Sequence, residues 1–509
     1  MTTDSQAHEI PTDGGPDPFE WLEDVEAPEA LAWVGHHNDV ARERLVTDRF
    51  RRLEAEVLEV LDSTDKIPGV VQRGSYLYNF WTDADHERGL WRRTTWESYR
   101  SEEPEWEVLL DIDELAEREG VNWVWHGAHV LRPSHDRALV ALSRGGADAD
   151  ITREFDLVTK TFVADGFTRE EAKGSLRWAD ESGNVVFAAT DVGEGSMTNS
   201  GYPRTVRRWQ RGTPLAEAPE VFAVAEDDLL AAAAHDFTPG FSRDVFVRAI
   251  AFYSSRTYLR EASGELRHLA VPDSAEVDVH REWLLVELRE DWQVGSRTYA
   301  GGSLLAAPVD DFLSGARDFE VLFAPTPETS LVAVAWTRHH LVLNTLHHVT
   351  NRLNVLTPPD SAGDAWRRRD LVLPAQVPAL TTIAISAIDP DAEDTLWLTV
   401  SGFLTPTTLS RLTLADDGTV ASVEELKSAP AFFDATGLEV TQHFATSADG
   451  TRVPYFQVGP RAADGPQPTL LSGYGGFEIP RLPAYSGTVG RGWLARGGTY
   501  VVAGIRGGG

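Results

Sequence analysis

One short stretch near the C-terminal end combines residue types that could stabilise a developing negative charge. Tyr474–Phe477 reads Y-G-G-F and follows the apolar run Thr469–Leu471. A tyrosine hydroxyl can donate a hydrogen bond to the oxyanion of an acyl-transfer intermediate, which needs preorganised donors about 3 Å away. The two glycines allow the backbone to turn sharply and to approach a ligand closely. An ordinary Gly-Gly turn beside a surface tyrosine explains the same residues, so local sequence leaves both interpretations open.

The nucleophile that should accompany such a donor is not found in the sequence. In α/β-hydrolases the serine lies in a G-x-S-x-G turn and precedes the acid and the histidine. The 509 residues contain no such pattern, and the nearest approach, Gly240–Asp244 (G-F-S-R-D), lacks the second glycine. The apolar strand Val501–Ile505 runs into the glycines that end the chain. We therefore expect the first half of an active site, with the nucleophile beyond Gly509.

Other kinds of chemistry have weaker support. The sequence has no cysteine, which excludes disulfides, thiolate metal sites and a cysteine nucleophile. Adjacent histidines on a strand point to opposite faces and chelate poorly, which argues against metal sites at His36-His37, His339-His340 and His347-His348. The closing glycines complete no phosphate-binding motif. We expect a structural role for Arg506, and neither a metal nor a cofactor.

Composition limits the partners and the compartment. The formal net charge of −33 argues against nucleic acid or an anionic membrane as a partner. The polar, acidic N-terminal residues have neither the basic nor the apolar region of a secretory signal. No run of 18 apolar residues is present. We expect a cytoplasmic protein.

The elements that must position the site change character along the chain. Residues 1–17 are expected to be flexible, and residues 28–62 have helical apolar spacing. Residues 74–432 contain many short strand patterns, such as Tyr76–Trp81 and Val185–Ala189, separated by turn residues. About 360 residues divided among seven four-stranded blades leave about 50 residues each, close to known propeller repeats. A parallel β-helix is the alternative, but it needs a more regular repeat. After residue 433, the hairpin dipeptide Asp449-Gly450 and two buried strands predict the start of an α/β layer.

Four motifs in order resemble those of the prolyl oligopeptidase family of serine peptidases. Asp17–Asp24 (D-P-F-E-W-L-E-D) resembles the family's opening motif, and Ser447–Pro454 (S-A-D-G-T-R-V-P) resembles its hairpin at re-entry to the catalytic domain. Tyr474–Phe477 matches the family's Y-G-G-F. Ala503–Gly509 (A-G-I-R-G-G-G) resembles its A-N-I-R-G-G-G, with Gly504 in place of the asparagine. The four motifs span nearly the whole chain.

The resemblance implies a seven-bladed β-propeller plus an incomplete α/β-hydrolase domain. Residues 1–73 would be the N-terminal segment of the hydrolase domain, 74–432 the propeller, and 433–509 the truncated start of the catalytic domain. By the same resemblance Tyr474 supplies the oxyanion-hole hydroxyl and Phe477 lines the substrate site. The Ser-His-Asp triad would lie beyond Gly509. The complete protein is then a monomeric serine oligopeptidase acting on short peptides, while the 509-residue chain is expected to show no peptidase or esterase activity.

Cleavage preference is the least determined property. The resemblance favours cleavage after proline. Where prolyl-specific members have a propeller phenylalanine a few residues before a tryptophan, this sequence has Lys173 before Trp178. An oligopeptidase B-like enzyme cutting after Lys or Arg is one alternative, and a propeller binding module without catalysis is another.

Overall fold

The computed structural model describes residues 17–347, 350–359, 364–373, 377–461 and 465–507. Its N-terminal part is helical, as the apolar spacing predicts. A 3₁₀ turn, η1 (Glu20–Glu23), precedes the helices α1 (Pro28–Leu45) and α2 (Asp48–Leu61). Thr47 separates the helices and caps α2, because its hydroxyl accepts a hydrogen bond from the Phe50 amide at 3.3 Å.

Seven successive antiparallel sheets follow within the described part of residues 71–428. The first three comprise β1 (Val71–Arg73), β2 (Tyr76–Trp81), β3 (Leu90–Thr95) and β4 (Glu107–Asp111); β5 (Trp123–Val130), β6 (Arg137–Arg144), β7 (Asp150–Asp156), β8 (Thr161–Phe162) and β9 (Thr168–Ala172); and β10 (Ser175–Trp178), β11 (Val185–Ala189), β12 (Thr205–Gln210) and β13 (Glu220–Ala223). The middle two comprise β14 (Leu230–Asp236), β15 (Arg243–Ala251), β16 (Ser254–Arg260) and β17 (Leu266–His268); and β18 (Glu276–His280), β19 (Trp283–Glu287), β22 (Leu304–Pro308) and β23 (Glu320–Phe323). The last two comprise β24 (Thr329–Trp336), β25 (Leu341–His347), β26 (Thr350–Thr357) and β27 (Arg367–Asp370); and β28 (Thr381–Ala387), β29 (Thr395–Gly402), β30 (Thr408–Leu414) and β31 (Val420–Ser428).

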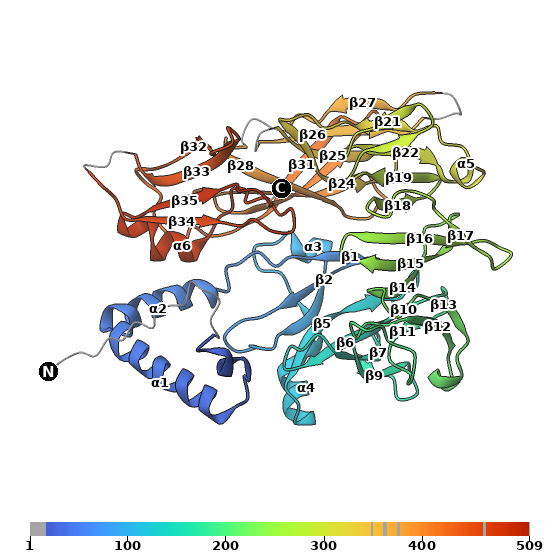
Figure 1. Ribbon diagram of the computed structural model, residues 1–509, viewed down its shortest axis with the longest axis horizontal. Coiled ribbons are helices and arrows are strands. Elements are labelled where there is room, and N and C mark those ends of the chain that lie inside the picture. The colour runs from blue at the N-terminus through green and yellow to red at the C-terminus, as the bar shows by residue number, and fades with distance from the viewer. Residues whose placement is uncertain (1–16, 348–349, 360–363, 374–376, 462–464, 508–509) are drawn as a thin grey trace.

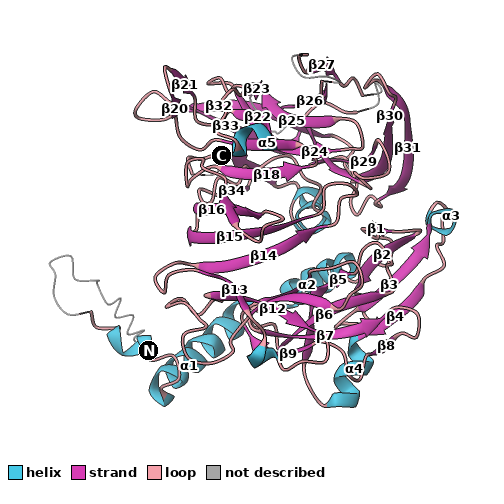
Figure 2. Ribbon diagram, turned by 90° about the vertical axis from the view of Figure 1, so that its right-hand side faces the viewer, coloured by secondary structure: helices cyan, strands magenta, loops and turns pink. Residues whose placement is uncertain are grey.

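Few helices interrupt these strands, as Figure 2 shows. The short helices are α3 (Trp96–Tyr99), α4 (Ile112–Glu119), α5 (Val309–Leu313) and the 3₁₀ turn η2 (Leu215–Glu217), and a small hairpin pairs β20 (Trp292–Val294) with β21 (Arg297–Tyr299). The strand patterns read from sequence coincide with observed strands. Helix α4 was not expected inside the strand region. Asp111 caps its N-terminus, because the Asp111 carboxylate accepts from the Glu114 amide, and the helix buries Ile112 and Leu115.

The sheets surround a common centre in chain order (Figure 1). In two pairs of neighbouring sheets the first strands meet, β10 with β14 and β24 with β28. Each pair of neighbouring sheets shares an apolar core, and that between the first two contains Tyr78, Trp91 and Phe155. Four-stranded antiparallel sheets arranged in this way form a β-propeller.

Side chains close the ring between the last sheet and the first. Trp96 stacks on Trp397 with ring centroids 5.3 Å apart. Arg100 pairs with Glu424 at 2.7 Å, and Lys427 donates to the Ser101 carbonyl at 2.6 Å. An apolar cluster that includes Leu77 and Leu409 lies at the same junction. The junction between sheets 1 and 7 is therefore held by packing, one ion pair and a hydrogen bond.

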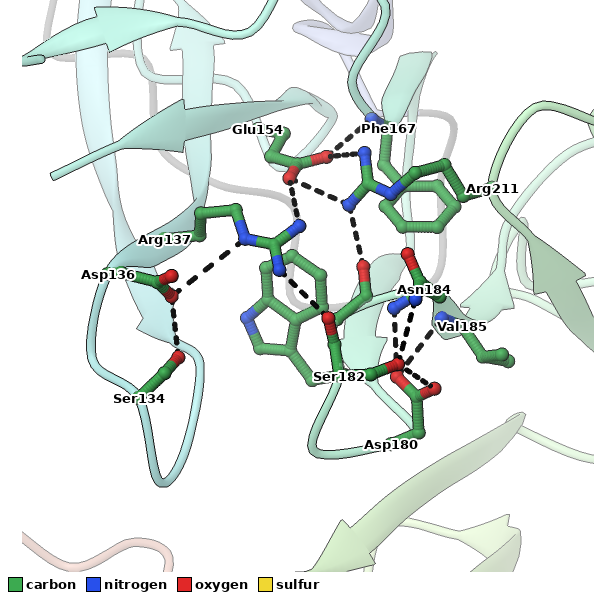
Figure 3. A network of polar contacts seen from close by, with 12 residues as sticks. Ser134, Asp136, Arg137, Glu154, Phe167, Asp180, Ser182, Asn184, Val185 and Arg211 are labelled. Atoms are coloured by element: carbon green, nitrogen blue, oxygen red, sulfur yellow. Dashed lines mark hydrogen bonds and ion pairs between the residues drawn. The ribbon is translucent and has the colours of Figure 1, made fainter. Parts of the chain in front are cut away.

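A buried carboxylate joins the second sheet to the third, as Figure 3 shows. The Glu154 side chain on β7 is fully buried. It accepts two hydrogen bonds from Arg211 at 2.9 and 2.8 Å, one from Arg137 at 3.5 Å and one from the Phe167 amide at 2.9 Å. Both guanidinium groups also donate to carbonyls of the β10–β11 turn, Arg137 to Ser182 and Arg211 to Gly183. Glu154 thus fixes two arginines that bridge neighbouring sheets.

The C-terminal part forms a mixed sheet of a different kind. Its strands are β32 (Leu438–Thr446), β33 (Arg452–Pro460), β34 (Thr469–Gly473) and β35 (Thr499–Ala503), in the order β32-β33-β35-β34. The Asp449-Gly450 turn joins β32 to β33 as predicted. The helix α6 (Gly487–Gly492) and the 3₁₀ turn η3 (Leu494–Arg496) connect β34 to β35, which run parallel. Helix α2 packs against α6, where Arg491 pairs with Glu59 at 2.6 Å.

Candidate active site

The Tyr474–Phe477 loop lies at the carboxyl end of a parallel strand pair. β34 and β35 are in register from Thr469 and Thr499 to Gly473 and Ala503. Each strand is therefore followed by a glycine-containing loop at the same edge of the sheet. In open α/β sheets this edge is where ligands bind.

The two loops touch so closely that side chains are excluded between them. A Cβ atom on Gly475 would lie 2.8 Å from the Arg506 carbonyl oxygen, and one on Gly507 would lie 2.3 Å from the Gly475 oxygen. Gly507 also has a φ of +82°, which favours glycine. The Glu478 amide donates to the Gly507 carbonyl at 3.0 Å. These glycines thus hold the Y-G-G-F loop against the loop that follows β35.

Tyr474 is half-buried, and its ring is covered by a cation. The Arg481 guanidinium lies 4.9 Å from the ring centroid. Within the described part of the chain, no hydrogen bond engages the Tyr474 hydroxyl. A fixed ring with an uncommitted O–H group can act as a donor to a ligand.

Phe477 extends from the same loop towards the propeller. Its side chain is 59% exposed, and its φ of +55° is unusual for a bulky residue. The ring lies 5.4 Å from that of Phe252, in the turn between β15 and β16. The fourth sheet of the propeller therefore contacts the candidate site directly.

An ion-pair cluster continues this contact. Arg289, which follows β19, pairs with Glu478 beside Phe477 and with Glu276 on β18 at 2.7 Å. Its guanidinium also lies 4.4 Å from the Tyr253 ring centroid. Burial opposes the charge on Arg289, but the hydrogen bonds to Glu276 and Glu478 outweigh it and raise the pKa of Arg289.

Next to this cluster, the carboxyl group of Glu287 lies where its ionisation is disfavoured. Glu287 faces Glu276 across the β18–β19 ladder. Burial first, and then the neighbouring Glu276 carboxylate, raise the pKa of Glu287 above its ordinary value. Three carboxylates thus gather around Arg289: Glu276 and Glu287 belong to the propeller, and Glu478 belongs to the C-terminal part.

A cavity of about 790 Å³ opens beside Glu478, between the sixth sheet and the C-terminal sheet. Its propeller wall is the segment from Thr326 to Val332, with Leu346, and its opposite wall includes Arg452, Pro454 and Pro480. This volume is of the size that holds small ligands. The cavity adjoins the loop that carries Tyr474 and Phe477.

Other residues considered from sequence have ordinary partners. Arg506 is exposed and pairs with Asp449, so it ties the loop after β35 to the β32–β33 turn. Lys173 pairs with Asp148 at 3.4 Å and lies 4.5 Å from the Tyr202 ring centroid. His339 and His340 lie in the turn between β24 and β25, where His339 is exposed and His340 is buried. His36 and His37 lie on helix α1, so the expectation that these two pairs sit on strands was wrong.

Of the histidine pairs, His348 lies outside the described residues. In the ranges that the structure describes, no three His, Asp or Glu side chains gather as a metal site would require. No helix there is both long enough and apolar enough to cross a bilayer.

Comparison with known proteins identifies the family. Residues 1–424 match the model of the prolyl oligopeptidase N-terminal β-propeller domain. The uncharacterized peptidase y4nA of Sinorhizobium fredii is 35% identical over 506 residues, which cover 97% of this chain and 68% of that protein. The uncharacterized peptidase RP174 of Rickettsia prowazekii is 27% identical over 515 residues, covering 97% and 69%. A solved post-proline cleaving enzyme from Rickettsia typhi aligns with a TM-score of 0.86 at 27% identity, covering 96% of this chain and 72% of that one. The chain belongs to the prolyl oligopeptidase family.

Proposed function

We propose that the complete protein is a serine oligopeptidase that hydrolyses short peptides after proline. The observation that carries the proposal is the Tyr474–Phe477 loop at the carboxyl end of the β34–β35 pair. In this role the Tyr474 hydroxyl donates to the oxyanion of the tetrahedral intermediate, and Phe477 lines the substrate site. The Rickettsia typhi enzyme, described as post-proline cleaving, supports the specificity.

The remaining catalytic groups belong to sequence outside the 509 residues. We place the Ser-His-Asp triad beyond Gly509, because no G-x-S-x-G turn occurs in this chain. The serine would attack the peptide carbonyl, the histidine would accept its proton, and the aspartate would orient the imidazole. The 509-residue chain alone then lacks peptidase activity.

The architecture proposed for the complete protein follows from the same family. The seven sheets are the blades of one propeller, which starts at β1 (Val71–Arg73) rather than at residue 74, because β1 pairs with β2. The residues before β1 and residues 433–509 belong to the α/β-hydrolase domain. The packing of α2 on α6 supports the assignment of the N-terminal helices. The propeller would exclude folded proteins, so that only short peptides reach the site. We propose a cytoplasmic monomer.

Cleavage after Lys or Arg is a second candidate, favoured by the carboxylates of Glu276, Glu287 and Glu478, of which Glu478 lines the cavity. A peptide library incubated with the complete protein and analysed by mass spectrometry separates the candidates. Products ending in proline support the first proposal, and products ending in Lys or Arg support the second. Absence of any serine-inhibitor-sensitive cleavage contradicts both and favours a binding module.

A further inference from the structure

The hairpin of β14 and β15 brings a serine, a histidine and an aspartate together away from the candidate active site. His235 and Asp244 are directly opposed in the β14–β15 ladder, and Ser242 is the last residue of the turn between the strands. Cross-strand partners on one face have Cβ atoms about 5 Å apart, which suits a hydrogen bond between their side chains. Ser242 belongs to Gly240–Asp244, the stretch of sequence that comes closest to a nucleophile turn.

The hydrogen bonds run in the order of a catalytic triad. Ser242 Oγ lies 3.0 Å from His235 Nε2, and His235 Nδ1 lies 2.7 Å from Asp244 Oδ1. An ionised carboxylate only accepts hydrogen bonds, so Nδ1 must carry the ring proton. In that tautomer Nε2 is an acceptor, and the serine hydroxyl donates to it. This arrangement allows an imidazole to act as general base towards a serine.

Neighbouring groups hold the three side chains in place. Arg260 on β16 lies 3.4 Å from the second carboxylate oxygen of Asp244. The Phe237 ring packs edge-on against the imidazole, with centroids 4.6 Å apart. The imidazole and the carboxylate are only 13% and 17% exposed, whereas Ser242 is exposed. The base and its orienting acid are therefore shielded, and the hydroxyl faces solvent.

This site is separate from the Tyr474–Phe477 loop. β15 begins at Arg243, next to Ser242, and ends at Ala251, next to the Phe252 turn that contacts Phe477. A strand of that length spans about 25–30 Å at roughly 3.3 Å per residue. Ser242 therefore cannot act on a carbonyl whose oxyanion is held by Tyr474.

We infer that Ser242, His235 and Asp244 form a second nucleophilic site on the propeller, which accepts acyl or phosphonyl groups from small activated esters. With an aryl ester, Ser242 Oγ attacks the carbonyl carbon while His235 Nε2 takes the hydroxyl proton. The bond to the aryl oxygen breaks, and the phenol leaves with that proton. The product is an ester of Ser242, which water hydrolyses slowly to the acid. This revises the sequence-based expectation that the 509-residue chain has no esterase activity.

The test uses the 509-residue chain and a fluorophosphonate probe. Here a bond forms between Ser242 Oγ and phosphorus, fluoride leaves, and the proton passes through His235 to solvent. Peptide mapping should place the adduct on Ser242. Since general base catalysis contributes roughly 10²–10⁴-fold, His235→Ala should slow modification of Ser242 by about 100-fold or more. Asp244→Asn should also slow it, because the amide can donate to Nδ1 and so favours the tautomer that blocks Nε2.

Ser182 provides a matched control. It is an exposed serine in the β10–β11 turn of the preceding sheet, and its hydroxyl donates to Asp180 at 2.7 Å. Ser182→Ala should leave labelling unchanged, and Ser182 itself should not be modified. Circular dichroism of each variant checks that the fold is retained. Absence of an adduct on Ser242 in the folded native chain would overturn the inference, as would labelling of Ser242 at an unchanged rate in His235→Ala.

Discussion

Replacing Glu154 by glutamine should destabilise the propeller with little change in side-chain volume. The carboxylate has no solvent exposure and accepts from Arg137, Arg211 and the Phe167 amide. Glutamine keeps one oxygen, but its NH₂ group must then face a donor. The two guanidinium groups also lose their shared buried counter-charge.

The expected loss in the free energy of unfolding follows from these contacts. Removing one partner of a buried ion pair costs about 3–5 kcal/mol, because the other charge is left uncompensated. Both arginine side chains remain 25% exposed, so we expect the lower end, about 3 kcal/mol. With an unfolding entropy of about 2.1 cal/mol/K per residue over about 360 propeller residues, the melting temperature should fall by about 4 °C.

Differential scanning calorimetry of the 509-residue chain measures this shift. Glu114→Gln is the control, since Glu114 and Arg118 form an exposed pair 3.9 Å apart. Such a pair contributes about 0–1 kcal/mol, so its loss should barely move the transition. A Glu154→Gln transition within about 1 °C of the native one, or as small a change as in the control, would refute the reasoning. Adding Arg211→Gln to Glu154→Gln should cost less than the sum of the single changes, because both remove the same contact.

Two further substitutions test the ring closure and the charge balance beside the site. Trp397→Ala removes the partner of Trp96 between the last and first sheets, and should cost about 3–5 kcal/mol in urea unfolding. A loss below about 1 kcal/mol would mean that this contact does not hold the ring closed. Glu287→Gln should stabilise the protein at neutral pH. The folded-state pKa of Glu287 is raised, so the Glu287 side chain does not destabilise the fold below the ordinary carboxyl pKa. The destabilisation develops as the pH rises through the raised pKa. Equal shifts in thermal unfolding at about pH 4 and about pH 7 would contradict this assignment.

Local patterns in the sequence predicted the elements better than the contacts between them. The limits of β2 and β11 follow from short apolar runs bounded by turn residues. Helix α4 was missed, because its eight residues are too few to stand out within a region of strands. The partners of Glu154 come from two different sheets, so no sequence spacing links them.

The two candidate sites also differ in how far the sequence alone predicts them. Tyr474 and Phe477 lie in one contiguous motif, which the sequence could single out. Ser242 does not stand out in the sequence, because its neighbours do not complete a G-x-S-x-G turn. The pairing of His235 with Asp244 depends on the register of β14 and β15, which places the two residues opposite each other. The contact of Phe477 with Phe252 likewise depends on how the propeller meets the C-terminal sheet.

The most direct test of the proposed peptidase is the turnover number of Tyr474→Phe in the complete protein. This change removes one oxygen and keeps the ring beneath Arg481. Loss of an oxyanion donor costs about 2.7–4 kcal/mol in the transition state, so kcat should fall about 10²–10³-fold while KM changes little. An unchanged kcat on a peptide that the native enzyme cleaves would contradict the role assigned to Tyr474.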